Sequence, residues 1–403
     1  MWVYLGLALL ALCLLVGLLA WRELSKPPPA GGTPFTLPNG KRIQHWQESE
    51  TAFLFTEIWG AESAYSRGGL LFRPGAVVLD AGANIGMFSL FAAERCGGRG
   101  TIVSFEPIPS THSVLQANAA AAAAASGGAL DWRALNVGLS DAPAATHFEH
   151  HPHFSVWSTR DKGFAEERLR RIEADIPRAL DSNPSWCVKA CFPRALAGAL
   201  ASLVLRQKVG LTQRVPVRLV TLSSVIEEQG LAGADIDFLK VDVEGAEVEV
   251  LRGIKAQHWP LIQQVALEVE NFASRDTVLA VLQAQGFATS HFASERERNP
   301  GVESEVRAGR AGLGPWEPLH TPLSHTHTRT HTLHARAQRQ VSMVYGIRDS
   351  YLAKWKGKAG AAAAAAGEGG ADKAAAAAGE GGGAEKEAAA KPAAAARRRH
   401  GRE

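Results

Sequence analysis

Two segments that lie far apart in this chain each combine a short apolar run with the polar residues that follow it. Val77 to Phe88 reads V-V-L-D-A-G-A-N-I-G-M-F, and Phe238 to Glu249 reads F-L-K-V-D-V-E-G-A-E-V-E. The first segment predicts a strand, a tight glycine turn and then a helix. Together the two segments predict an α/β enzyme that holds a nucleoside-bearing cofactor at the carboxyl edge of a parallel sheet.

The glycines of the first segment have a physical role. A tight turn needs residues that tolerate positive φ and that lack a Cβ where a ligand approaches the backbone, so Gly82 and Gly86 are the candidates. A second strand, 101–105, ends in Glu106. Its carboxylate would lie at the tip of the neighbouring strand, where it could accept hydrogen bonds from both hydroxyls of a ribose.

Five segments resemble the FkbM-type methyltransferases and occur in that family's order. They are D-A-G-A-N-I-G at 80–86, F-E-P at 105–107, N-V-G-L-S-D at 136–141, T-L-S-S-V-I at 221–226 and D-F-L-K-V-D-V-E-G-A-E at 237–247. The resemblance covers about residues 75–290 and implies a class I methyltransferase that uses S-adenosyl-L-methionine, usually on a hydroxyl oxygen.

The resemblance also implies roles for individual residues. Asp80, Gly82, Asn84 and Gly86 would line the methionine and ribose part of the cofactor, with Glu106 on the ribose. Ser140 and Asp141, at the end of the third motif, are candidates for the adenine side.

The pattern of strands and helices predicts the fold class. Strand candidates alternate with helices, which indicates parallel strands with helices on both faces of a Rossmann-like sheet. Resemblance to class I methyltransferases implies a terminal antiparallel pair at 287–292 and 341–348. The strand candidates of the parallel part are 77–80, 101–105, 131–137, 236–242 and 263–269.

Carboxylates at the strand ends are the candidate catalytic groups. Asp242 is the first choice for the active centre, to orient or deprotonate the acceptor, followed by Glu244 and Glu268. Clustered carboxylates would raise the pKa of one member or form a hard-metal site, and the sequence leaves both possibilities open, although no metal ligand set is assigned. For Glu247, capping of the next helix is an equal alternative.

Two other functions are compatible with a Rossmann-like turn. A nicotinamide-dependent oxidoreductase needs glycine at the first, third and sixth turn positions, where this chain has Gly82, Asn84 and Met87. A non-catalytic membrane scaffold that keeps a degenerate methyltransferase domain has no physical need of Asp80, Glu106 and Asp242 together. Both readings are less favoured than a methyltransferase.

Composition narrows the acceptor and the organisation of the chain. A net charge of +3 over 403 residues, without a basic stripe in the motif-bearing region, argues against nucleic acid and for a small molecule, sugar or lipid. Nothing in the sequence indicates an oligomeric state. The predicted divisions are a linker at 22–40, a methyltransferase domain at 41–348 with insertions at about 142–214 and 293–340, and a low-complexity Ala/Gly-rich tail at 349–403.

Residues 1–21 form an apolar run without charge, about the length that a helix needs to cross a bilayer. An uncleaved membrane anchor is favoured over a signal peptide because the run lacks an initial Lys or Arg and has Leu18 three positions before a cut after Ala20. Arg22 and Lys26 follow the run, which predicts a catalytic domain on the cytosolic side.

Overall fold

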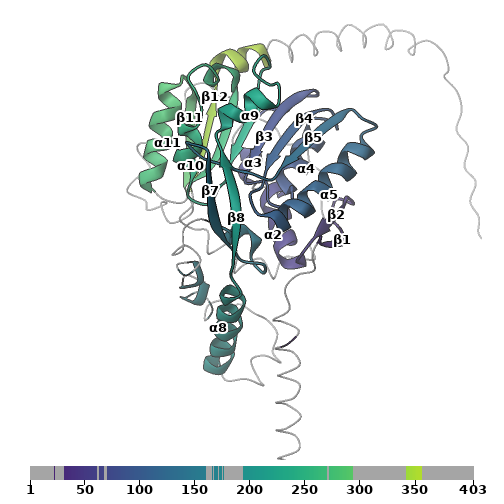
Figure 1. Cartoon of the computed structure of the whole chain (residues 1–403), viewed down its shortest axis with the longest axis vertical. Helices are drawn as coiled ribbons and strands as arrows, with labels where there is room; N and C mark the ends of the chain where they lie inside the picture. Colours follow the sequence, from purple (N-terminus) through teal and green to yellow (C-terminus); the bar gives the residue numbers. More distant parts are fainter. Residues whose placement is uncertain are drawn as a thin grey trace, which may run out of the picture. The chain divides into compact units, whose positions relative to one another are not determined.

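A computed structural model describes residues 22, 31–60, 63–67, 70–159, 194–269, 272–293 and 342–355, together with part of 166–176 (Figure 1). The chain divides into two compact units, Met1–Asp349 and Ser350–Glu403. In the second unit the described residues, 350–355, are helical. The first unit contains all the strands described below.

A seven-stranded sheet forms the centre of the first unit, with the order β11-β12-β10-β9-β3-β4-β5. The five strands from β10 to β5 are parallel, whereas β12 is antiparallel to both β10 and β11. This confirms the predicted α/β fold with its terminal antiparallel pair. The strands are β3 (Ala76–Ala81), β4 (Gly100–Phe105), β5 (Leu130–Leu135), β9 (Phe238–Val241), β10 (Gln264–Val269), β11 (Ala288–Ala293) and β12 (Ser342–Ile347).

Alternate residues of the strands face two separate hydrophobic cores. Leu79 and Leu239 belong to one core, while Val78 and Phe238 belong to the other. The first core is covered by α9 (Leu222–Glu228), α10 (Glu247–Arg252) and α11 (Phe272–Ala284), and the second by α2 (Glu48–Trp59), α4 (Met87–Arg95) and α5 (Pro109–Ala125). Figure 1 shows these helices on both faces of the sheet, as predicted.

The chain before the sheet contributes a hairpin and two helices. The hairpin pairs β1 (Thr33–Thr36) with β2 (Arg42–His45), so regular structure begins upstream of residue 41, where the sequence predicted the domain to start. Helix α2 follows, then α3 (Ala64–Arg67). The sequence predicts that Phe53, Phe55, Ile58 and Trp59 form an apolar face that covers the sheet or the cofactor. Phe53 and Ile58 are buried, which agrees with this prediction.

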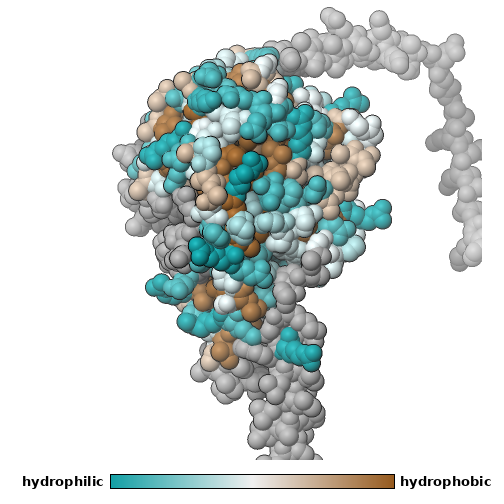
Figure 2. Space-filling view, viewed as in Figure 1, coloured by the Kyte–Doolittle hydropathy of each residue, from teal (hydrophilic) through white to brown (hydrophobic). Residues whose placement is uncertain are grey.

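A small sheet that the sequence did not predict begins before the insertion and ends after it. Strands β6 (Gly138–Leu139), β7 (Ala144–His150) and β8 (Gln213–Val220) form it in the order β6-β8-β7, with the one-turn helix η1 (Ser155–Trp157) after β7. The sequence predicts a helix from Phe164 to Leu180 in the insertion at 142–214 and irregular structure elsewhere in it, so β7 corrects that prediction. Helix α8 (Arg194–Gly210) also lies here, and Leu203 on it is 53% exposed. Figure 2 shows hydrophobic residues on the surface of the region that α8 occupies in Figure 1.

Several predictions concern residues outside the described ranges. They are the anchor at 1–21, the His/Thr-rich part of the insertion at 293–340 and most of the tail at 349–403. Within the part of the chain that the structure describes, no helix is both long enough and apolar enough to span a bilayer.

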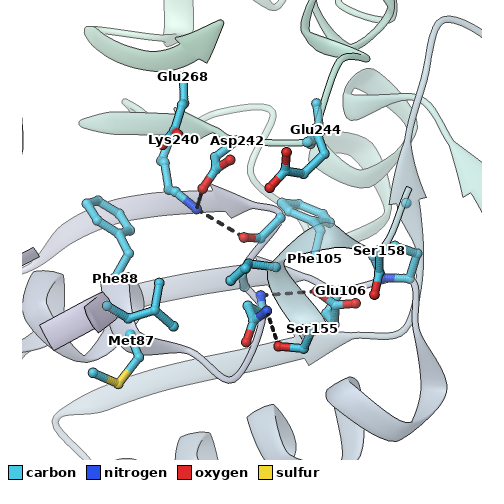
Figure 3. Close-up of a pocket in the computed structure, with 18 of the residues that line it drawn as sticks. Met87, Phe88, Phe105, Glu106, Ser155, Ser158, Lys240, Asp242, Glu244 and Glu268 are labelled. Atoms are coloured by element: carbon cyan, nitrogen blue, oxygen red, sulfur yellow. Dashed lines mark hydrogen bonds and ion pairs between the residues drawn. The ribbon is translucent and has the colours of Figure 1, made fainter. Parts of the chain in front are cut away.

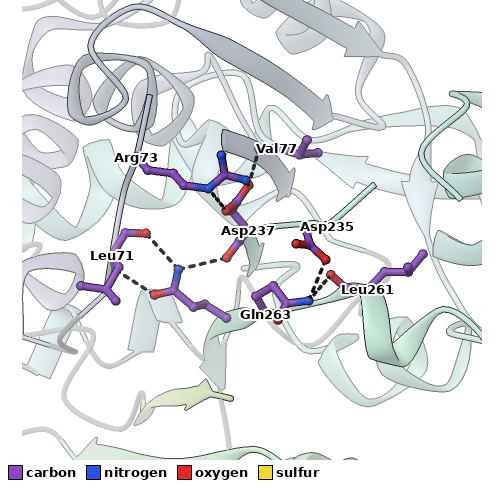
Figure 4. Close-up of polar contacts among 8 residues, drawn as sticks. Leu71, Arg73, Val77, Asp235, Asp237, Leu261 and Gln263 are labelled. Carbon is purple, nitrogen blue, oxygen red and sulfur yellow. Dashed lines mark hydrogen bonds and ion pairs between the residues drawn. The ribbon is translucent and has the colours of Figure 1, made fainter. Parts of the chain in front are cut away.

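A polar cluster joins the beginnings of β3 and β9 at the edge of the sheet opposite the carboxyl ends (Figure 4). The Asp237 carboxylate, which is 1% exposed, accepts hydrogen bonds from the Arg73 guanidinium at 2.8 Å and from the Val77 backbone N–H at 2.9 Å. Gln264 donates from Nε2 to the carbonyl oxygens of Leu71 and Asp237. The segment before β3 is thereby fixed to β9 and β10, the next two strands on that side of the sheet.

We expect Asp237→Ala to lower the free energy of unfolding by about 2–4 kcal/mol, because it leaves the partly solvated Arg73 cation and a buried N–H without their acceptor. Urea denaturation of the full chain measures this. The matched control is Asp131→Ala, which removes the 50% exposed partner of Arg133 and should change stability by no more than about 1 kcal/mol. Equal losses in the two variants would contradict the assignment.

Candidate active site

The candidate site lies where the strand order reverses, between β3 and β9. The chain proceeds from β3 to β4 and β5 on one side, and from β9 to β10 on the other, and ligands of open α/β sheets bind at this crevice. A pocket occupies it (Figure 3), with a wall from each of these strand ends, from α2 and from the segment after β7. Six of the ten predicted site residues line the pocket: Gly82, Asn84, Glu106, Asp242, Glu244 and Glu268.

The glycine turn after β3 is shaped by the protein's own backbone. Gly82 and Gly86 have φ of +76° and +91°, as the sequence predicted. A Cβ at Gly82 would collide with the carbonyl oxygen of Asp242, and one at Gly86 would press on Leu115 and Trp132. Close packing inside the domain therefore requires both glycines, which the sequence did not predict. The approach of a ligand stays a prediction for Gly82, which lines the pocket, whereas Gly86 does not line it.

Asp80 is also beneath the pocket wall rather than in it. Its side chain is 0% exposed, and Oδ2 accepts a 2.6 Å hydrogen bond from Ser89 Oγ. Because the single Ser89 proton is used there, Ser104 Oγ must donate to Ser89, and Ser104 in turn accepts from the Trp132 indole N–H at 2.8 Å. Asp80 thus ends a buried chain of hydrogen bonds that crosses β5, β4 and α4.

Lys240 connects the ends of β3 and β9. Its Nζ donates to the Gly82 carbonyl oxygen at 3.0 Å and lies 3.2 Å from carboxylate oxygens of Asp80 and of Asp242. Burial alone would lower the pKa of Lys240, but the charges of Asp80 and Asp242 outweigh it and hold that pKa above its ordinary value. The sequence predicts this pairing with a neighbouring acid, because Lys240 alternates with the apolar Leu239 and Val241 in the strand, and the structure confirms it.

Glu106 follows β4 and is held by the backbone. Its two carboxylate oxygens accept hydrogen bonds from the N–H groups of Asn84, at 3.1 Å, and Ile108, at 2.9 Å. Burial raises the pKa of Glu106 to about 7, although these hydrogen bonds and the Lys240 charge oppose the shift. A carboxylate has about four acceptor positions, so two remain for a ligand in the pocket.

The three predicted catalytic carboxylates differ in their surroundings. Asp242, 29% exposed at the end of β9, is paired with Lys240. Glu244 has a φ of +54° and forms a 2.8 Å ion pair with Arg168 of the insertion, so it is already engaged. Glu268 lies on β10, one residue beyond the paired Leu267 and Val241. Asp242 and Glu268 therefore lie on adjacent strands, as the predicted cluster requires.

Tyr65 lies beside these acids. Burial first, and then the negative charges of Asp242, Glu268 and other acids, raise the pKa of Tyr65 far above its ordinary value. Its phenol remains neutral and would act as a hydrogen-bond donor, not as a base. Within the described ranges, no group of three or more His, Cys, Asp or Glu side chains is arranged to hold a metal ion.

The segment after β5 reaches the pocket with other residues than predicted. Gly138 and Leu139 line the pocket, whereas Ser140 and Asp141 do not. Ser140 is buried, with its N–H donating to Val220 of the small sheet, and its hydroxyl contacts Asp141.

Glu247 and the histidines at 147–153 lie outside the pocket wall. Glu247 is the first residue of α10, and its buried carboxylate accepts a 2.7 Å hydrogen bond from the Gly245 N–H just before the helix, in agreement with a role at the helix start. The sequence also makes the histidines at 147, 150, 151 and 153 candidate catalytic groups, because they follow the third strand near the active edge. None of the four lines the pocket, although His150 contacts Ser158, which does.

Sequence reasoning missed the residues that close the pocket from other parts of the chain. Ser155 and Ser158 come from the insertion, and Leu54 and Glu57 from α2. Glu50, also on α2, does not line the pocket but accepts a hydrogen bond from the hydroxyl of Ser155, which does. No local motif indicates these residues, since only the folded chain brings segments about 100 positions apart together.

Comparison with known proteins gives a consistent result. A family model described as the Methyltransferase FkbM domain matches residues 80–292. The 31-O-demethyl-FK506 methyltransferase FkbM of Streptomyces tacrolimicus is 34% identical over 252 residues, which is 62% of this chain and 87% of that protein. The chain belongs to the FkbM methyltransferase family. It is therefore an S-adenosylmethionine-dependent methyltransferase, and the oxidoreductase and scaffold readings are set aside.

Other proteins similar to this chain are also named as methyltransferases. Methyltransferase sdnD of Sordaria araneosa is 32% identical over 247 residues, or 59% of this chain and 82% of that protein. The crystal structure of an FkbM methyltransferase from Methylobacillus flagellatus KT aligns over 82% of this chain and 58% of its own, at 10% identity and a TM-score of 0.37. That structural similarity is too low to carry an argument.

We expect Gly82→Ala to destabilise the domain by more than about 3 kcal/mol, because a Cβ would overlap the Asp242 carbonyl in addition to the cost of positive φ. The control is Gly75→Ala, with the same sign of φ, +77°, but open space around the new methyl group, for which about 1 kcal/mol is expected. Chemical denaturation compares them. A small, equal loss in both variants would show that the turn moves freely.

Proposed function

We propose that the pocket binds S-adenosylmethionine and that the enzyme methylates a hydroxyl oxygen of a small molecule, sugar or lipid. The observation that carries this proposal is the position of Glu106, a buried carboxylate beside the switch point with two acceptor positions remaining. A ribose has two adjacent hydroxyl donors, so this acceptor set fits it. The apolar surfaces of Leu139 and Phe105 suit the adenine base.

S-adenosylmethionine supplies a methyl group carried on a positively charged sulfur. As the acceptor oxygen forms a bond to the methyl carbon, the carbon–sulfur bond breaks and the sulfur is left as a neutral thioether. The hydroxyl proton must then leave the acceptor. Asp242 is our candidate to orient or accept that proton, since it is partly exposed at the pocket and Lys240 holds its carboxylate in place. Glu244 is less suited because Arg168 occupies it, and Glu268 is the next candidate.

The hydroxyl acceptor is supported by the relatives. The name of the Streptomyces tacrolimicus protein describes a methyl transfer to an O-demethylated compound. Membrane attachment through residues 1–21 is proposed on the sequence alone, and fractionation of the chain with and without this segment tests it.

Calorimetric titration of the full chain with S-adenosylmethionine tests cofactor binding, and Glu106 gives it a pH signature. Ribose hydroxyls stabilise the ionised carboxylate, whose pKa in the free protein is about 7. Affinity should therefore increase as pH rises from 6 to 8. In Glu106→Gln, binding should be weaker by about 1–3 kcal/mol at pH 8, and this part of the pH dependence should disappear.

Titration of the ligand's own groups is common to both proteins and cancels in the comparison. No binding heat with the wild-type chain would contradict the proposed function. Parallel pH profiles in the wild type and the variant would remove Glu106 from the site.

We expect Asp242→Asn to lower turnover by about 10²-fold or more, the scale of general-base catalysis, while changing cofactor affinity much less. Release of S-adenosylhomocysteine measures turnover, with an acceptor found by screening hydroxylated small molecules, sugars and lipids. Asp141→Asn, an exposed acid outside the pocket, is the control. Wild-type turnover in Asp242→Asn would transfer the role to Glu268.

A further inference from the structure

Glu50 is a buried acid of α2 that lies behind the pocket wall. It is 8% exposed and precedes the residues matched by the family model, 80–292. Its Oε1 accepts hydrogen bonds from the Ser155 hydroxyl and from the Val156 N–H, each at 3.1 Å. These two donors belong to the first turn of η1, which has no side-chain cap of its own. Glu50 therefore caps η1 from a helix about 100 positions earlier in the chain.

Ser155 passes this contact to the turn after β3. Its single hydroxyl proton is donated to Glu50, so its oxygen is left to accept a 2.8 Å hydrogen bond from the side-chain amide of Asn84 (Figure 3). The backbone N–H of Asn84 donates to Glu106. A continuous path of hydrogen bonds thus runs from Glu50 through Ser155 and Asn84 to the carboxylate proposed to hold the ribose.

Two members of this path, Asn84 and Glu50, are destabilising unless their partners stay in place. Asn84 is a non-glycine residue with a φ of +50°, a conformation that persists only where surrounding contacts fix it. A buried carboxyl is destabilising without hydrogen-bond donors, and burial raises the pKa of Glu50 to about 7 in spite of the donors from Val156 and Ser155. Ordering of η1 and ordering of the Asn84 side chain therefore support each other.

We propose that Glu50 is a positioning residue of the cofactor site, which holds Ser155 and, through it, the Asn84 turn against Glu106. The inference rests on the proposed binding of S-adenosylmethionine to this pocket. It adds α2, which lies outside the family match, to the parts of the chain that set cofactor affinity. Glu50 contacts no ligand in this scheme and acts through the two residues of η1 that it holds, Ser155 and Val156.

The test compares Glu50→Ala, Ser155→Ala and the double variant with the wild-type full chain. Alanine is used at position 50 because glutamine would keep the Oε1 atom that accepts both hydrogen bonds. Each single variant should bind S-adenosylmethionine about 5- to 30-fold more weakly, the scale of one buried hydrogen bond lost from a preorganised site. The double variant should bind no more weakly than the weaker-binding single variant, because both changes interrupt one path. Glu48→Ala, at an exposed acid on the same turn of α2, should bind like the wild type.

A second readout needs no cofactor. In the ligand-free chain, amide hydrogen exchange at Asn84 and at 155–158 should be faster in Glu50→Ala and Ser155→Ala than in the wild type or Glu48→Ala. If the wild type fails to bind, the proposed function falls, and exchange alone decides this inference. Unchanged exchange, wild-type affinity in both single variants, or fully additive losses in the double variant would each overturn it. Should Glu50→Ala not fold, Ser155→Ala gives the decision.

Discussion

The ammonium group of Lys240 is the interaction on which the centre of the molecule depends. It lies at the reversal of strand order, between Asp80, Asp242 and the carbonyl oxygen of Gly82. Without it, two carboxylates would face each other at the ends of neighbouring strands, which is unfavourable in a buried environment. The same cation connects the ends of β3 and β9 beneath the pocket and holds the Asp242 carboxylate at the pocket surface. A substitution of Lys240 should therefore change both the stability of the domain and the properties of the pocket.

Much of the fold was predictable because the strands of a parallel sheet are apolar runs with turn residues at their ends. All five predicted parallel strands and both strands of the terminal pair are present. Site residues were predicted less well, since the sequence locates a strand end but not the direction of each side chain. Asp80 and Asp242 both follow buried runs, yet Asp80 lies inside the hydrogen-bonded interior and Asp242 lines the pocket. The Gly82 conformation was predictable, whereas the Asp242 carbonyl that requires it was not.

The parts that could not be predicted come from contacts distant in sequence. Arg168 pairs with Glu244 across the pocket rim, and Glu50 reaches Ser155 from α2. A signal for the missed sheet was present, because Val215, Val217 and Leu219 of β8 alternate with polar or exposed neighbours. Pro216 obscured this signal, because proline is unusual inside a strand. It is tolerated here because the short β6 pairs with Leu219 and Val220 of β8 and does not extend to Pro216. Among the described strands, none lies beside Pro216 on that edge of β8.

The pocket is formed by segments that differ in how freely their residues can be substituted. Its floor belongs to the sheet, where glycine packing and the buried lysine leave little freedom for substitution. Phe53, Leu54 and Glu57 come from α2, a helix that the family model does not include. Substitution of Phe53 or Leu54 would change the shape of this wall without altering the sheet or the contact between Glu50 and Ser155. The pocket can therefore be reshaped from α2 at positions that leave its floor unchanged.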